Sequence, residues 1–178
     1  MSDVSREYGA ALYQLAREDH AEEELLEETR TASAVLRENP AYLSLLSSPD
    51  LKKEERSNAV AAAFAGGHRY LSNFLTMMVE RGYAREIPAC FDEYLRLYRE
   101  EHGIAVAKVR SARPLSDDEK EKLVAALERR YDVTVEAEYA IDPSLLGGMK
   151  VEISGMLLDG SARRKLDGVR ADLSALTL

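Results

Sequence analysis

Residues 141–166 read IDPSLLGGMKVEISGMLLDGSARRKL, which combines strand-like alternation with repeated turn signals. Apolar side chains alternate with polar ones over residues 149–153, and this period of two predicts a strand with one apolar face. A glycine then turns the chain, residues 156–158 run back, and Asp159 with Gly160 turns it again. Ser161 follows as the cap of a closing helix. The stretch therefore predicts a small sheet covered by a helix, and it shows no nucleophile beside a base.

The segments before this stretch extend the same architecture. Residues 104–110 predict a strand, and residues 133–141 alternate most clearly of all. Between them, Ser116 and Glu119 have the spacing of a capping box, which predicts a helix that runs to about Arg130. The last part of the chain therefore reads as a small α/β unit.

The first hundred residues have a different period. From Ser5 to His102, apolar residues recur at helical spacing, and proline and glycine breaks divide the pattern into about six helices. The period changes from about 3.6 to 2 after Gly103, so we place the domain boundary there. The predicted fold is α+β and multidomain: a six-helix bundle over residues 1–103, followed by a small α/β domain over residues 104–178.

The charge of the chain limits its partners. It has 24 Lys and Arg against 32 Asp and Glu, a formal net charge of −8, and residues 1–103 hold 12 of the former and 19 of the latter. Because this excess repels phosphate backbones at long range, we expect no nucleic-acid partner. No apolar run approaches the roughly 20 residues that cross a bilayer, so we expect no direct membrane insertion. The opening residues also lack the pattern of a secretory signal, which predicts a cytoplasmic location.

Residue types that carry chemistry are present but are not arranged for it. Residues 155–161, GMLLDGS, have the glycine spacing of a phosphate-binding loop, with serine where its lysine belongs, and this favours a hairpin turn. Cys90, the lone cysteine, lies in a helical pattern and is interpreted as a buried, inert thiol. The three histidines lie next to helix ends and share no metal-ligand spacing: His20, His68 and His102. We expect no cofactor, no metal ion and no catalytic residue.

One enzymatic alternative stays open. Asp142, Asp159 and Ser161 are an acid, a base and a nucleophile by residue type, and distance in sequence does not prevent them from meeting in a small hydrolase. Turn preferences alone explain both aspartates, because Asp142 precedes a proline and Asp159 precedes a glycine.

An aromatic and methionine stripe in the first part admits two interpretations, core filling or a groove for an incoming helix. Methionine adapts to irregular surfaces and is common where proteins bind amphipathic helices. The stripe comprises Tyr70, Phe74, Met77 and Met78, and the groove would be shared with Tyr8, Ala11 and Leu12.

Four blocks, in this order, resemble the delta subunit family of bacterial F-type ATP synthases, whose mitochondrial relative is the oligomycin sensitivity-conferring protein. They are REYGAALYQLA from Arg6, SNFLTMMVERG from Ser72, VRSARPLSDDEK from Val109, and IDPSLLGG from Ile141 with LLDGSARRKL after it. The resemblance covers nearly the whole chain. Tyr83 departs from it, because the family often has arginine after the glycine equivalent to Gly82.

The resemblance implies a non-catalytic stator subunit that ties the catalytic head to the peripheral stalk and resists rotor torque during proton-driven ATP synthesis. It further implies that the helical bundle holds the N-terminal helix of one alpha subunit between its first and fifth helices, and that the α/β domain joins the b subunits of the stalk. The complex would place the chain peripherally on the cytoplasmic face of the bacterial plasma membrane. The implied partner-binding residues are Tyr8, Ala11, Leu12, Leu15, Asn73, Phe74, Met77 and Met78. An unrelated helical scaffold of similar architecture remains the third reading.

Overall fold

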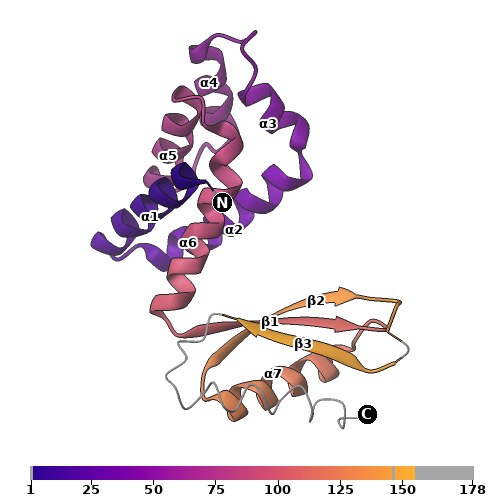
Figure 1. Ribbon diagram of the computed structural model, residues 1–178. Coiled ribbons are helices and arrows are strands. Elements are labelled where there is room, and N and C mark those ends of the chain that lie inside the picture. Colours follow the sequence, from indigo (N-terminus) through magenta and orange to yellow (C-terminus); the bar gives the residue numbers. More distant parts are fainter. Residues whose placement is uncertain (1, 146, 155–178) are drawn as a thin grey trace. The chain divides into compact units, whose positions relative to one another are not determined.

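The computed structural model describes residues 2–145 and 147–154 (Figure 1). These residues form α-helices and a three-stranded sheet, which confirms the α+β class. The chain divides into two compact units, residues 1–98 and residues 99–178. The two units meet in the last turn of α6, and Arg99 pairs with Glu136 of the second unit at 2.7 Å; the domain boundary at Gly103 stays a prediction.

Six α-helices and one short 3-10 helix occupy the described residues up to Glu101. Helices α2 to α6 end just before the proline or glycine breaks that the sequence predicts, whereas α1 ends at Glu18, ahead of His20 with its φ of 55°. They are α1 (Asp3–Glu18), α2 (Glu22–Glu38), α3 (Pro40–Leu46), α4 (Lys53–Ala63), α5 (Arg69–Glu80), η1 (Ala84–Glu86) and α6 (Ile87–Glu101). Each of α1, α5 and α6 buries one apolar side. The fully buried residues of the first unit include Leu12, Leu75, Met78 and Phe91, which places its core between these helices.

Gly9 sets the approach of α1 to α6. A Cβ atom at this position would lie 2.4 Å from the carbonyl oxygen of Cys90 and 2.7 Å from the Cβ of Glu93. Real Cβ atoms do not approach other atoms so closely, so only glycine permits this helix crossing. The crossing fixes α1, which also packs beside α5.

The second unit contains a βαβ arrangement. Strand β1 (Ile104–Ser111) pairs in parallel with β2 (Thr134–Ile141), and α7 (Asp117–Tyr131) connects them. Strand β3 (Met149–Ser154) pairs antiparallel with the other edge of β1, giving the order β2-β1-β3. Figure 1 shows α7 along one face of this sheet.

The core of the second unit follows the predicted alternation. Its buried members are Ala107, Val109, Leu123, Leu127 and Val135, from β1, α7 and β2. Met149, Val151 and Ile153 of β3 pack against them, which confirms the apolar face predicted for that strand.

The helix start predicted at Ser116 is also confirmed. The Ser116 and Glu119 side chains form the predicted capping box, and the neighbouring Arg113 bonds Glu119 at 2.6 Å. The predicted return strand 156–158, the turn at Asp159 and the helix cap at Ser161 lie outside the described residues.

Candidate partner-binding groove

A groove of about 450 Å³ lies between α1 and α5. It is lined by Tyr8, Ala11, Leu12, Leu15, Tyr70, Asn73, Phe74 and Met77. Seven of these eight residues belong to the partner-binding set that the family resemblance implied, so the fold brings those seven together around one hollow.

Met78 is the member of the predicted set that the groove does not include. It is fully buried, whereas its neighbour Met77 is half-buried and lines the groove. Adjacent residues of a helix point about 100° apart, so one of the pair faces the groove and the other faces the core. Tyr70 lines the groove as well, as the aromatic stripe on α5 suggested.

The groove has an apolar floor and an open middle. Leu12 and Phe74 are buried and form its base, and the Phe74 ring also packs on Phe91 in the core, with 5.9 Å between centroids. Ala11 is exposed, and Leu15 keeps 46% of its surface exposed. A helix that laid its apolar side here would cover these residues without opening the core.

The dimensions of the groove suit a short helical contact. Tyr8 and Leu15 are seven residues apart on α1, which corresponds to two turns, or about 10 Å. The small side chain of Ala11 lies between them and leaves room for a second helix. An apolar stripe at spacing i, i+3 or i+4, and i+7 on an incoming helix matches this length.

Tyr70 stands at one end of the groove in a hydrogen-bonded cluster. Its hydroxyl donates to Asp19 at 2.5 Å, and Arg69 donates to the same carboxylate at 2.7 Å. The hydrogen bonds from Tyr70 and from Arg69 lower the pKa of Asp19. The cluster joins the end of α1 to the start of α5, so it holds the two walls together at this end.

Tyr8 stands at the other end beside a different cation. Arg81, just after α5, donates to the Tyr8 hydroxyl at 2.7 Å, and its guanidinium carbon lies 5.8 Å from the centroid of the ring. The ring of Tyr83 packs against Tyr8 with 6.0 Å between centroids. Because Arg69 contacts α1 near its end and Arg81 contacts it near its start, α1 and α5 run antiparallel.

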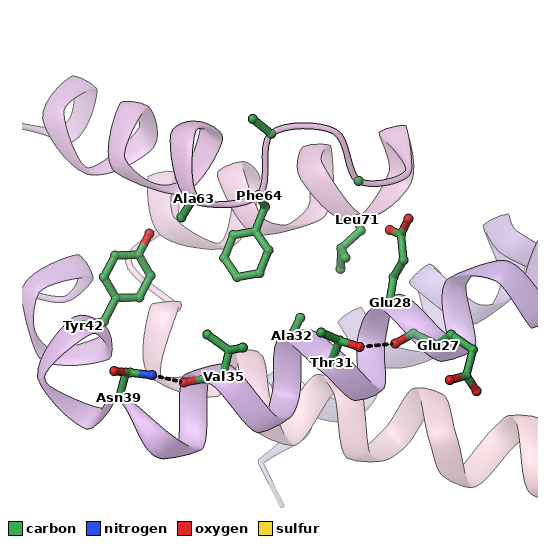
Figure 2. A pocket seen from close by; sticks show the side chains of 12 residues that line it. Glu27, Glu28, Thr31, Ala32, Val35, Asn39, Tyr42, Ala63, Phe64 and Leu71 are labelled. Carbon is green, nitrogen blue, oxygen red and sulfur yellow. Dashed lines mark hydrogen bonds between the residues drawn. The ribbon is translucent and has the colours of Figure 1, made fainter.

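A second hollow, of about 620 Å³, lies between α2 and the α4–α5 connection (Figure 2). It is the larger of the two, and its middle is apolar, lined by Val35, Phe64 and Leu71. Figure 2 shows Asn39 bonded to Val35, and Thr31 bonded to Glu27. Its polar side chains thus already bond protein groups.

Glu28, at the rim of this second hollow, likewise has a structural role. Its carboxylate accepts hydrogen bonds of 2.8 and 2.9 Å from the backbone nitrogen of His68, at the start of α5. No local pattern in the sequence indicates this hollow, because its lining comes from α2, α3, α4 and α5.

Two residues that could take part in catalysis, Asp142 and Cys90, have structural surroundings instead. Asp142 accepts hydrogen bonds from the backbone nitrogen and the hydroxyl of Ser144, as a turn aspartate does, and these bonds lower its pKa. Asp159 and Ser161 lie outside the described residues. Burial, with a smaller contribution from Glu86, raises the pKa of Cys90 to about 12, which keeps the thiol protonated.

The described residues contain neither a candidate metal-binding cluster nor a candidate membrane-spanning helix. In residues 2–145 and 147–154, no group of three or more His, Cys, Asp and Glu side chains lies close enough together to hold a metal ion. Within these ranges, no helix is both long enough and apolar enough to cross a membrane.

Comparison with known proteins decides the family. The model of the family described as "ATP synthase delta (OSCP) subunit" matches residues 4–173. This chain belongs to that family. Its relatives include the ATP synthase subunit delta of Geobacillus sp., 33% identical over 171 residues that cover 96% of each chain. The ATP synthase subunit delta of Clostridium kluyveri is 28% identical over 168 residues, which cover 94% of this chain and 93% of that one.

A solved structure shares the fold. A chain in the cryo-EM structure of the Toxoplasma gondii mitochondrial ATP synthase hexamer superposes with a TM-score of 0.66 at 23% identity, covering 99% of this chain and 100% of that one. The assignment as a non-catalytic stator component of an F-type ATP synthase, which the resemblance implied, is thus confirmed at the level of the family. Nothing in the comparisons favours the hydrolase or the unrelated scaffold.

Proposed function

We propose that this chain ties the catalytic head of an F-type ATP synthase to its peripheral stalk on the cytoplasmic face of the bacterial plasma membrane. Its helical bundle, residues 1–103, holds the N-terminal helix of one alpha subunit in the α1/α5 groove. Its α/β domain, residues 104–178, joins the b subunits of the stalk.

The α1/α5 groove supports the proposed contact with the alpha-subunit helix. Its lining is apolar apart from the Tyr8 and Tyr70 hydroxyls and the Asn73 amide, and its walls are fixed at both ends by hydrogen bonds between the helices. A preformed apolar groove binds an amphipathic helix at low conformational cost, because its own side chains are already ordered.

The division of the chain into two units supports the proposed second contact, between the α/β domain and the b subunits of the stalk. During rotation the central rotor exerts torque on the head, and a tether resists that torque only when it is held at both ends. Two independent contacts, one on each domain, meet this requirement. Under load, slow dissociation matters more than fast association, and dissociation rates are what interface packing mainly controls.

The test is to purify the native complex through a tag on this chain and to identify its partners. We expect alpha and b subunits in stoichiometric amounts. Isothermal titration of the full chain with a synthetic peptide of the alpha-subunit N-terminus then measures the groove contact directly. Recovery of the chain without ATP synthase subunits would contradict the proposal.

A further inference from the structure

The apolar residues in the middle of the α1/α5 groove do not determine in which direction a bound helix runs. Ala11, Leu12, Leu15, Phe74 and Met77 offer apolar contacts that an amphipathic helix can make when it runs either way or slips by one turn. In coiled coils, one polar or charged contact is enough to fix register and orientation. Asn73 is the polar side chain of the lining between Tyr8 and Tyr70, and because its amide both donates and accepts hydrogen bonds it does not distinguish an acidic partner from a basic one. The charged groups that can select one orientation lie at the two ends of the groove.

The two ends differ in charge. At the Tyr70 end, Arg69 lies 2.7 Å from the Asp19 carboxylate, so this cation already has an anionic partner. At the Tyr8 end, Arg81 bonds a neutral phenol, and among the described residues no carboxylate lies within ion-pair distance of it. A guanidinium has five N–H donors, and this contact uses one of them.

Arg81 is also held in place before any partner arrives. Tyr8, which lines the groove, accepts the hydrogen bond from Arg81 and lies beneath its guanidinium, and the Tyr83 ring packs against the Tyr8 ring. Fixing a long side chain normally costs entropy on binding, and here the protein has already ordered it. The exposed cation therefore stands ready at the rim of an apolar groove.

We propose that Arg81, positioned by Tyr8, binds a carboxylate on the incoming helix and so determines which end of that helix lies beside Tyr8. This inference rests on the proposed function and adds the charge of the partner to it. The partner is an amphipathic helix with Asp or Glu about one turn, roughly 5 Å, beyond its last apolar anchor at this end. The pairing acts on orientation more than on total affinity, since the apolar contacts supply most of the binding.

The experiment uses the full chain and two synthetic amphipathic peptides with the same apolar stripe. One peptide carries glutamate after the last apolar residue at its C-terminal end, and the other carries it before the first at its N-terminal end. Each has a nitroxide label at its N-terminus, and amide signal loss in the protein reports whether the label lies near Tyr8 or near Tyr70. We expect the label to change ends between the two peptides.

Affinity is measured in parallel at low and at high salt. Replacing the glutamate of either peptide with lysine should weaken binding by roughly two- to fivefold at low salt, the range of an exposed ion pair. Arg81→Glu should reverse this preference. Arg85→Glu is the matched control, because Arg85 is exposed and, unlike Arg81, makes no hydrogen bond to a groove-lining residue in the described part of the chain. Its reversal changes the net charge equally and should leave the preference in place.

The outcomes separate the two claims. Label positions that are the same for both peptides, or equal effects of Arg81→Glu and Arg85→Glu, would overturn the inference and leave the groove intact. Failure of the unmodified chain to bind either peptide or the alpha-subunit peptide would overturn the proposed groove and the inference with it. Arg81→Gln, which removes the charge without reversing it, should abolish the preference, and its thermal melt shows whether folding is retained.

Discussion

Replacing Ala11 with glutamate places a carboxylate in the middle of the α1/α5 groove. In the free protein Ala11 is exposed, so the new side chain stays in water. The cost to folding is then the lower helix propensity of glutamate and the like-charge pair with Glu7 four residues earlier, each a few tenths of a kcal/mol. We expect the free energy of unfolding to fall by less than about 1 kcal/mol.

In the complex the same carboxylate faces an apolar helix and loses its hydration without gaining a partner. Desolvation of this kind, at the centre of an interface, costs about 2–4 kcal/mol. The dissociation constant for an alpha-subunit N-terminal peptide should therefore rise roughly 30- to 1,000-fold. Titration calorimetry measures this change, and scanning calorimetry of the same sample measures stability.

Two variants bracket the result. Ala34→Glu changes an exposed alanine of α2 that lines neither hollow, and it should leave both stability and affinity nearly unchanged. Ala16→Glu changes a fully buried alanine of α1 and should unfold the bundle. If Ala11→Glu binds the peptide as tightly as Ala34→Glu does, the groove lies elsewhere. If it behaves like Ala16→Glu, Ala11 belongs to the core.

Four further outcomes are expected. Residues 1–103 expressed alone should give a helical circular dichroism spectrum and a cooperative melt, and a fragment without either would contradict the domain division. Gly9→Ala should lower the free energy of unfolding by about 1–3 kcal/mol in denaturant titrations, because its Cβ would lie 2.4 Å from a carbonyl oxygen of α6; an unchanged midpoint would refute the close approach. Cys90, whose pKa burial raises to about 12, should react with a thiol reagent at pH 8 only after denaturant is added, and rapid labelling of the native chain would show that it is accessible. Hydrogen bonds from Arg113 and, to a smaller extent, from the Ser116 backbone lower the pKa of Glu119 to about 2, so the native state binds this proton less tightly than the unfolded state. The resulting stabilisation is present above about pH 4.5 and is lost as the pH falls toward 2, and carboxyl NMR titration of Arg113→Ala should find the Glu119 midpoint raised but still below its ordinary value, because the Ser116 hydrogen bond remains; an unchanged midpoint would refute the role of Arg113.

Local sequence determined the elements of this protein. The helix that begins at Ser116 could be predicted because both partners of its capping box lie within three residues of each other. The apolar face of β3 follows from alternation, since a period of two is a property of the strand itself. Four groove residues of α1, from Tyr8 to Leu15, recur at the 3.6-residue period of a helix, which is likewise a local property of the sequence. Their role as partner-binding residues, however, was inferred from resemblance to a family and not from periodicity.

Tertiary structure decided which residues meet. Periodicity does not tell whether Met77 or Met78 faces the core, because that choice depends on the helices packed around α5. The contacts that close the two ends of the groove join residues 50 and 73 positions apart, Arg69 with Asp19 and Arg81 with Tyr8, and no local pattern marks such pairs. These contacts form only because α1 packs antiparallel to α5, and that packing depends on the core that the helices of the bundle share. The sequence therefore specifies the side chains of the groove, and only the packing of distant helices gives the groove its two unlike ends.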